Sequence, residues 1–253
     1  MQVKGHVAMV TGGGSGLGRA CALMLAQEGA NVVIADINPE AGPKVVAEVK
    51  KLGRDAFSLP TDSCNKAQVC KIVQEGVKKF GKIDILVNNA GIGGGGQIRE
   101  MQEDIWDRII AVHLKSMMLC SQACVESMIP QKWGRIVNII SRAAFRGRAG
   151  VGPYSAAKGG MLAYSRVLAQ EVSQWGITVN NVAPGTALTP MVASAFKTAE
   201  TQYNEAKTSG VITQPVRLAH DTEIAGAVLY FCGPNSDHTN GTTLHVNGGS
   251  FMP

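Results

Sequence analysis

Two residues of this 253-residue chain have side chains, and a spacing, that suit proton transfer. Tyr154 and Lys158 form the pattern Y-x-x-x-K. On an α-helix, residues four apart share one face, so the phenol and the ammonium would point into the same space. A nearby ammonium stabilises phenolate and lowers the tyrosine pKa from its usual value of about 10. Such a tyrosine could exchange a proton with a carbinol near neutral pH.

The same spacing occurs again at Tyr203 and Lys207, so the surroundings must separate the two pairs. Tyr154 follows an apolar, strand-like run by one loop, and Ser141 ends that run. Ligands of open α/β sheets bind at the carboxyl ends of the strands, where the Ser141 hydroxyl could hold a substrate oxygen as charge develops. We therefore predict Ser141, Tyr154 and Lys158 as the catalytic group, and we place the second pair on a surface helix.

A glycine-rich run near the N-terminus has the chemistry of a phosphate-binding loop. It reads T-G-G-G-S-G-L-G at 11–18, with the spacing G-x-x-x-G-x-G formed by Gly12, Gly16 and Gly18. The three glycines would allow a tight turn, a close approach to a pyrophosphate and close packing of a helix on a strand. The helix that follows would direct N–H groups and its positive dipole end at the phosphates. The run predicts a dinucleotide site.

Asp36 predicts which dinucleotide binds. It ends the second predicted strand, where a carboxylate accepts hydrogen bonds from the adenosine ribose. The same carboxylate would repel a 2′-phosphate, and neither Ile37, Asn38 nor Ser15 carries a positive charge. We therefore expect NAD rather than NADP.

The elements that would position these residues alternate along the whole chain. Short apolar runs predict strands at 6–11, 31–36, 55–60, 83–87, 135–140, 177–182 and 243–246. Longer periodic stretches predict helices at 16–28, 39–52, 66–80, 104–128, 153–175 and 221–231. Apolar strands alternating with helices indicate a parallel sheet covered on both faces. We predict an α/β fold with one doubly wound domain over residues 1–253.

Five marks, in this order and spacing, resemble the short-chain dehydrogenase/reductase family over essentially the whole chain. They are T-G-G-G-S-G-L-G at 11–18, N-N-A-G at 88–91, Ser141, Y-S-A-A-K at 154–158 and P-G-T-A-L-T at 184–189. The resemblance implies a Rossmann-type sheet, NAD(P)-dependent interconversion of alcohols and ketones, and usually a homotetramer.

The resemblance also implies residue roles. It places Asp62 at the adenine, Asn88 at the sheet and cofactor pocket, and Thr189 at the nicotinamide amide, with Lys158 on the nicotinamide ribose. The cofactor-binding set that we predict comprises Gly12, Ser15, Gly16, Leu17, Gly18, Asp36, Ile37, Asp62, Ser63, Asn89, Ala90, Gly91, Tyr154, Lys158, Pro184, Gly185, Thr186 and Thr189. The remaining histidines show no metal-ligand spacing, so we predict no metal.

Two positions depart from the family pattern. Where the family usually has Asn in its long fourth helix, this chain has His113 in V-H-L. That position helps to hold a water on the proton relay, partly through its backbone carbonyl. We therefore count His113 with the catalytic residues, as a relay that still works and titrates or as a buried histidine that only packs. Asn247, in V-N-G-G, stands where the family often has Asp, and we assign it a structural role.

The substrate is indicated by two segments. The loop between Ser141 and Tyr154 carries Arg142, Arg146 and Arg148. Arginine suits carboxylate and phosphate, so these residues predict either an anionic substrate, such as a carboxylate or an acyl-CoA thioester, or ion pairs on a subunit or solvent surface. The segment 186–213, which includes Met191, is predicted to close over the substrate as a lid.

The positive charge of the chain is concentrated around the loop between Ser141 and Tyr154. The chain has 24 Lys and Arg against 19 Asp and Glu, a net charge of +5, and residues 127–170 contain no acidic residue.

The composition also argues against several other classes of protein. With only 5% aromatic residues, a nucleic-acid partner is not expected. No apolar run approaches the roughly 18 residues of a membrane span, and the N-terminus does not resemble a signal peptide. Six scattered cysteines favour a reducing, cytoplasmic compartment. A catalytically silent NAD(H) sensor or scaffold is the rival function.

Overall fold

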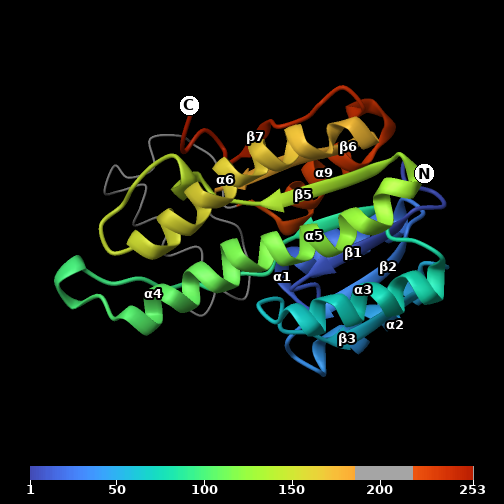
Figure 1. Cartoon of the computed structure of the whole chain (residues 1–253), viewed down its shortest axis with the longest axis horizontal. Coiled ribbons are helices and arrows are strands. Elements are labelled where there is room, and N and C mark those ends of the chain that lie inside the picture. Colours follow the sequence, from blue (N-terminus) through green and yellow to red (C-terminus); the bar gives the residue numbers. More distant parts are fainter. Residues whose placement is uncertain (186–218, 253) are drawn as a thin grey trace.

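The computed structural model describes residues 1–185 and 219–252, and its centre is one parallel sheet (Figure 1). The strands are β1 (Val7–Thr11), β2 (Asn31–Asp36), β3 (Ala56–Pro60), β4 (Ile85–Asn88), β5 (Gly134–Ile139), β6 (Ile177–Pro184) and β7 (Thr243–Val246). Their order across the sheet is β3-β2-β1-β4-β5-β6-β7, and every neighbouring pair is parallel. The predicted doubly wound, Rossmann-type α/β fold is confirmed.

Helices cover both faces of the sheet. They are α1 (Gly16–Gln27), α2 (Ala41–Lys51), α3 (Lys66–Phe80), α4 (Glu103–Ile110), α5 (Ser116–Met128), α6 (Gly152–Val172) and α9 (Asp221–Cys232). Because side chains alternate along a strand, Ala8 and Val10 join a core with α1, α2 and α9, whereas Val7 and Met9 join a core with α3, α5 and α6. Each strand is therefore apolar on both sides, which explains its continuous hydrophobic run.

The strand order reverses between β1 and β4, and this reversal sets the place of a ligand site. From β1 the chain adds β2 and β3 on one side, then returns to add β4 on the other. At such a switch point the connections leave in opposite directions, so a crevice opens at the carboxyl ends of the two strands. The glycine-rich loop follows β1, and the segment N-N-A-G begins at the end of β4.

The long helix predicted at 104–128 contains a distortion that the prediction lacked. Helices α4 and α5 are joined without a break by a π-helical turn, Ala111–Lys115, which carries His113. Such turns are frequent at functional sites. Among the described residues, the continuous helix Glu103–Gln131 is long and apolar enough to cross a membrane, but half of its most apolar window is buried inside the fold. Its α5 part packs on the sheet with α3, as a core helix does.

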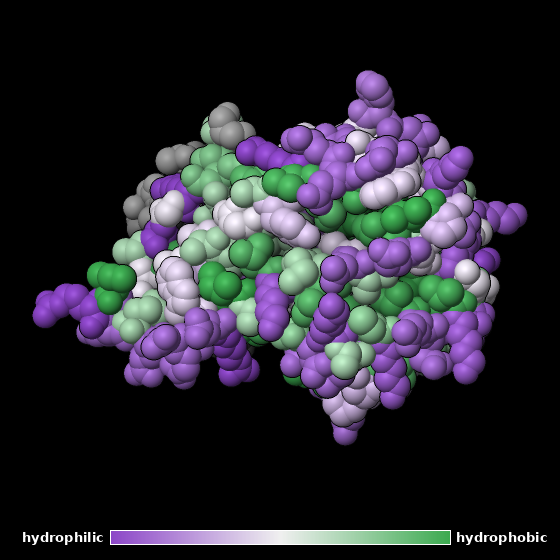
Figure 2. Space-filling model, viewed as in Figure 1, coloured by the Kyte–Doolittle hydropathy of each residue, from purple (hydrophilic) through white to green (hydrophobic). Residues whose placement is uncertain are grey.

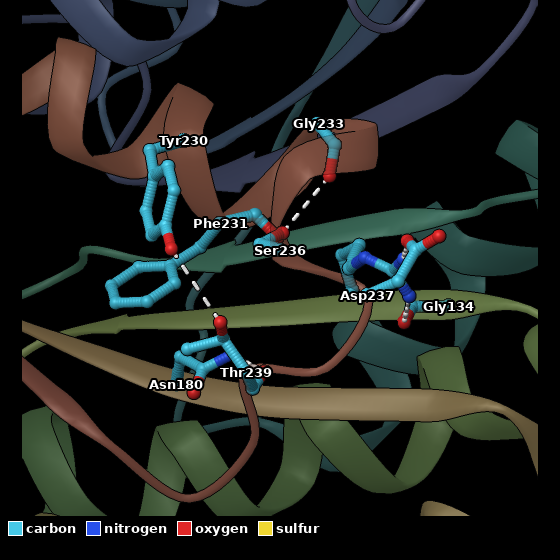
Figure 3. A network of polar contacts seen from close by, with 9 residues as sticks. Gly134, Asn180, Tyr230, Phe231, Gly233, Ser236, Asp237 and Thr239 are labelled. Atoms are coloured by element: carbon cyan, nitrogen blue, oxygen red, sulfur yellow. Dashed lines mark hydrogen bonds and ion pairs between the residues drawn. The ribbon is translucent and has the colours of Figure 1, made fainter.

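Polar contacts fasten the connection from α9 to the edge strand β7 (Figure 3). The Ser236 hydroxyl donates to the carbonyls of Phe231 and Gly233, at 3.0 and 2.9 Å. From β6, the Asn180 side-chain amide donates to the Thr239 carbonyl at 2.7 Å. These bonds fix the approach to β7, and the C-terminal residues continue from that strand.

The face that carries α5 and α6 is mixed in character. Hydrophobic side chains gather there between rims of polar ones (Figure 2). Val167, on α6, is half exposed. The predicted lid at 186–213, with Thr186, Thr189 and Met191, lies outside the described residues, as do Tyr203 and Lys207.

Candidate active site

The loop between β1 and α1 can be built only with glycine at its key positions. Gly12 and Gly16 adopt φ values of +59° and +50°, in the left-handed region that side chains disfavour. A Cβ at Gly18 would lie 2.0 Å from the Gly12 carbonyl oxygen, so the start of α1 packs directly on the loop. Ser15, at the N-cap of α1, makes no side-chain hydrogen bond to the first N–H groups of the helix, and such N–H groups can bind a pyrophosphate. The tight turn at Gly12 and the close helix packing at Gly18 are present, and the binding of a pyrophosphate stays a prediction.

The turn after β4 is clamped to this loop across the switch point. The Thr11 hydroxyl accepts hydrogen bonds from the backbone N–H groups of Asn89 and Ala90, both at 3.0 Å. In return, the Asn89 side-chain amide donates to the carbonyls of Thr11 and Gly12 at 3.0 and 3.1 Å. These bonds place the predicted cofactor residues of both segments together.

Asp36 is held beside the glycine loop by backbone donors. Its two carboxylate oxygens accept from the N–H groups of Gly14 and Asn38, at 2.8 and 2.9 Å. The adjacent Ile37 side chain is 72% exposed and available to a flat ligand. The chain segment of Asp62 lies next to this strand end, because the N–H of Thr61 donates to the Asp36 carbonyl at 2.8 Å. The predicted adenosine residues therefore share one edge of the sheet.

The predicted catalytic residues meet at the carboxyl end of β5. Tyr154 and Lys158 lie in the first turns of α6, and the lysine ammonium is 5.7 Å from the centre of the tyrosine ring. Lys158 is buried, and its Nζ donates to the Ile139 carbonyl at 2.6 Å. Burial lowers the pKa of Lys158 to about 7. Ser141 accepts from the N–H of Ala143 at 3.1 Å and is hydrogen-bonded to Tyr154.

The expected effect of the ammonium on the phenol is wrong for this geometry. Burial raises the pKa of Tyr154, and the hydrogen bond with Ser141 opposes that rise without cancelling it. Removal from water disfavours the charged form of a phenol and of an amine alike, so the pKa of Lys158 falls as that of Tyr154 rises. Spacing alone could place the ammonium near the ring but could not reveal this loss of solvation.

His113, in the π-helical turn, lies against Tyr154. Its ring is buried and meets the Tyr154 ring edge-on, with centroids 5.2 Å apart. Nε2 lies 2.8 Å from the Ile92 carbonyl oxygen, whereas Nδ1 has no hydrogen-bond partner among the described residues. Burial, reinforced by the Lys158 charge, lowers the pKa of His113 to about 3. The imidazole is therefore neutral at physiological pH, which disfavours a titrating relay.

The loop arginines form a positive group next to Ser141. Arg142 begins the short helix Arg142–Ala144, capped by the Ser141 side chain, and is partly buried. Its pKa is lowered by burial and then by the charges of Arg146 and Arg148, so the three guanidinium groups lie near one another. Arg146 and Arg148 are exposed, and no carboxylate in residues 1–185 or 219–252 forms an ion pair with either.

Two glycines of the loop after β4 make contacts that sequence reasoning missed. A Cβ at Gly95 would lie 2.0 Å from the Gly150 carbonyl oxygen, so this loop packs on the loop that precedes Tyr154. A Cβ at Gly91 would lie 2.4 Å from the His113 ring. The run of glycines at 93–96 was the available signal, but nothing in it indicates the partner.

The remaining predicted positions are partly placed. Pro184 ends β6, and the N–H of Gly185 donates to the Val246 carbonyl at 3.0 Å, which leaves both at the carboxyl end of the sheet. All six cysteines are free. Across the described ranges, no group of three or more His, Cys, Asp or Glu could hold a metal ion.

Comparison with known proteins places this arrangement among enzymes of one kind. The family model described as short chain dehydrogenase matches residues 6–200. The chain is 40% identical over 249 residues to (2S)-[(R)-hydroxy(phenyl)methyl]succinyl-CoA dehydrogenase subunit BbsD of Thauera aromatica, covering 98% of each chain. It is 35% identical to 3-oxoacyl-[acyl-carrier-protein] reductase FabG of Vibrio cholerae over the full length of both.

A solved structure of a dehydrogenase has the same fold as this chain. The 7α-hydroxysteroid dehydrogenase complexed with NADH and 7-oxo glycochenodeoxycholic acid superposes with a TM-score of 0.92 at 32% identity. The match covers 98% of this chain and 95% of that one.

Proposed function

This chain belongs to the short-chain dehydrogenase/reductase family of oxidoreductases that act on CH–OH groups, and from that premise we propose that it interconverts a secondary alcohol and a ketone with NAD. The observation that carries the proposal is the grouping of Ser141, Tyr154 and Lys158 at the end of the sheet that also holds the glycine loop. The test is a spectrophotometric scan for NADH formation over a panel of secondary alcohols. No turnover on any member, in either direction, would contradict the proposal.

The residues present fit a nicotinamide dinucleotide, whose bound ring supplies the hydride acceptor or donor. The left-handed glycines and the packing of Gly18 on the Gly12 carbonyl bring the start of α1 close to the loop, which is the arrangement that a pyrophosphate site needs. Tyr154 takes the carbinol proton during oxidation and returns it during reduction. Ser141 donates to the substrate oxygen as negative charge grows there, and Lys158, whose pKa burial lowers to about 7, supplies a nearby positive charge in its protonated form.

Tyr154→Phe tests the proton transfer directly. It removes the hydroxyl but keeps the ring that packs on His113. We expect turnover to be abolished while NADH binding, measured by fluorescence titration, is unchanged. The same variant addresses the rival function of a catalytically silent NAD(H) sensor, which would have no turnover to lose. Substantial residual turnover would refute the role of Tyr154.

The preference for NAD rests on the fixed Asp36 carboxylate. Two backbone N–H groups hold the carboxylate in place, so a 2′-phosphate at the ribose would meet a negative charge that cannot turn away. Neither Ile37 nor Asn38 offers a compensating positive charge. The solved relative that contains NADH supports the choice. A higher kcat/KM with NADPH than with NADH would overturn it.

A second candidate, an anionic or thioester-linked substrate, is favoured by the loop arginines. Arg146 and Arg148 are exposed beside the catalytic group, and two relatives are named for a CoA substrate and an acyl-carrier-protein substrate. A panel of matched neutral and anionic ketones tests this. We expect Arg146→Ala with Arg148→Ala to lower kcat/KM for the anionic ketone, and Arg166→Ala on α6 serves as the matched control. Equal efficiency on both ketones would refute the candidate.

The remaining proposals concern assembly, the lid and the compartment. The mixed hydrophobic face over α5 and α6 supports subunit contacts, as a homotetramer needs (Figure 2). Sedimentation analysis at several concentrations tests the tetramer. We keep residues 186–213 as the lid of a single domain. The absence of any disulfide among the cysteines is compatible with a cytoplasmic site of action.

A further inference from the structure

Three aromatic rings from two distant segments of the chain meet beside the active site. We call Phe145, His245 and Phe251 the aromatic cluster. Phe145 stacks on Phe251 with ring centroids 5.7 Å apart and an interplanar angle of 24°. His245 closes the cluster at 4.8 Å from Phe145 and 5.7 Å from Phe251. The cluster joins the C-terminal residues to the loop that follows the catalytic serine.

Phe145 is coupled to Ser141 through a compact turn. It follows Ser141 by four residues, and its N–H donates to the Arg142 carbonyl at 3.0 Å. The preceding N–H, from Ala144, donates to the Ser141 carbonyl at 3.0 Å. The Phe145 ring also packs against a small core that includes Met161 of α6. Movement of this ring would therefore move the backbone that positions the serine hydroxyl.

The C-terminal tail, residues 247–252, is folded back so that its aromatic ring reaches this turn. The Asn247 side-chain amide donates to the Phe251 carbonyl at 2.8 Å. Its side-chain oxygen accepts from the N–H of Gly249 at 3.0 Å, and its carbonyl accepts from the N–H of Ser250 at 3.1 Å. Gly248 and Gly249 have φ values of +61° and +76°, which the reversal needs. Both functions of the Asn247 amide are thus used within the tail.

The base of the tail is fixed to the sheet. His245 pairs in register with Ala183 of β6, and Val246 pairs with Pro184. The tail therefore starts from an anchored strand and ends on a ring that touches the catalytic loop.

We propose that the C-terminal tail is a positioning element of the active site, in which Phe251 holds the loop 142–151 through Phe145. The inference rests on the proposed function for its kinetic consequence. Held in this way, Ser141 keeps its bonds to Ala143 and Tyr154, and the loop arginines stay beside the catalytic group. Phe251 acts through Phe145 and is a positioning residue.

The first test needs no substrate. Arg146 and Arg148 are exposed trypsin sites within the held loop. Phe251→Ala removes a ring contact, so we expect cleavage in this loop to accelerate about fivefold in the folded protein, read by mass spectrometry of the fragments. Phe251→Tyr should restore the wild-type rate. Met252→Ala is the matched control, because that neighbouring side chain is 72% exposed.

The second test is kinetic. We expect Phe251→Ala to lower kcat about fivefold while the NADH dissociation constant stays unchanged, because the Phe251 ring meets Phe145 and His245, which both lie outside the predicted cofactor-binding set. A fall in thermal stability with no change in kcat would mark a merely structural role and overturn the proposal. So would loop cleavage indistinguishable from that of Met252→Ala.

Two further variants separate the possible failures. If Phe251→Ala does not fold, Phe251→Leu keeps apolar volume without a ring and is carried through both assays. In a Phe145→Ala background, Phe251→Ala should add no further acceleration of cleavage, and independent effects would refute coupling through Phe145. If wild type turns over no alcohol or ketone, the proposed function fails, while the proteolysis result still decides whether the tail holds the loop.

Discussion

The buried Lys158 ammonium should cost the folded protein stability in a way that pH can relieve. Burial lowers the pKa of Lys158 to about 7, from an ordinary 10.5. Between these values the folded state holds the amine neutral while the unfolded chain keeps it protonated. The unfolded state then binds more protons, so the free energy of unfolding rises with pH. The cost is fully present below about pH 7 and is relieved as the pH approaches 10.5.

The magnitude follows from the two pKa values. One proton of difference gives a slope of about 1.4 kcal/mol per pH unit, so Lys158 contributes a rise of about 2 kcal/mol between pH 7 and 9. Lys158→Met keeps much of the side-chain volume and removes the charge. We expect this variant to be more stable than wild type at pH 7, with the difference shrinking by about 2 kcal/mol at pH 9.

Urea unfolding of the cofactor-free protein at several pH values measures the difference. Other groups with shifted pKa values, such as the buried cysteines, are common to both proteins and cancel when the curves are subtracted. His113 loses the effect of the Lys158 charge in the variant, but burial, the larger cause, still lowers its pKa, so the imidazole is neutral in both proteins between pH 7 and 9. Lys51→Met, at an exposed position of α2, is the matched control and should follow the wild-type curve. Parallel curves for wild type and Lys158→Met would refute the reasoning, because they would show that the ammonium keeps its proton when buried.

Three other substitutions test the site. Asp36→Ala removes the fixed carboxylate and should raise the ratio of kcat/KM for NADP over NAD by about tenfold or more, and an unchanged ratio would contradict the assignment. Gly95→Ala places a Cβ 2.0 Å from the Gly150 carbonyl oxygen and should lower kcat/KM. Gly147→Ala, which has open space around its Cβ, should leave kcat/KM unchanged. Equal effects of the two variants would show that the contact between Gly95 and Gly150 does not support the site. His113→Asn should keep kcat within about tenfold of wild type, and a complete loss would show that the imidazole itself is required.

The elements of the sheet were predictable because each is coded locally. The run N-V-V-I-A-D at 31–36 is apolar on both faces and corresponds to β2 residue for residue. The π-helical turn at Ala111–Lys115 was not predictable, because an apolar pattern fixes which side of a helix is buried and not whether a carbonyl bonds four or five residues ahead. The same pattern therefore predicted one helix at 104–128.

The site was predictable where its chemistry lies within one segment. Y-x-x-x-K places Tyr154 and Lys158 on one face of a helix by spacing alone, and the glycine loop contains its own conformational requirement. The rise of the Tyr154 pKa above its ordinary value was not predictable in this way. It depends on how much water the surrounding layers exclude, and those layers come from every part of the chain.

The sequence by itself determined the order of strands and helices along the chain, and it predicted a phosphate loop and a catalytic group, since these depend on neighbours within a few residues. Tertiary structure decided which loops touch. Thr11 meets Asn89, Gly95 meets Gly150, and Phe251 reaches Phe145, across separations that no local pattern records. Packing of the layers brings these segments together. The same packing excludes water from the site, and this loss of solvation shifts the pKa values of its titratable groups.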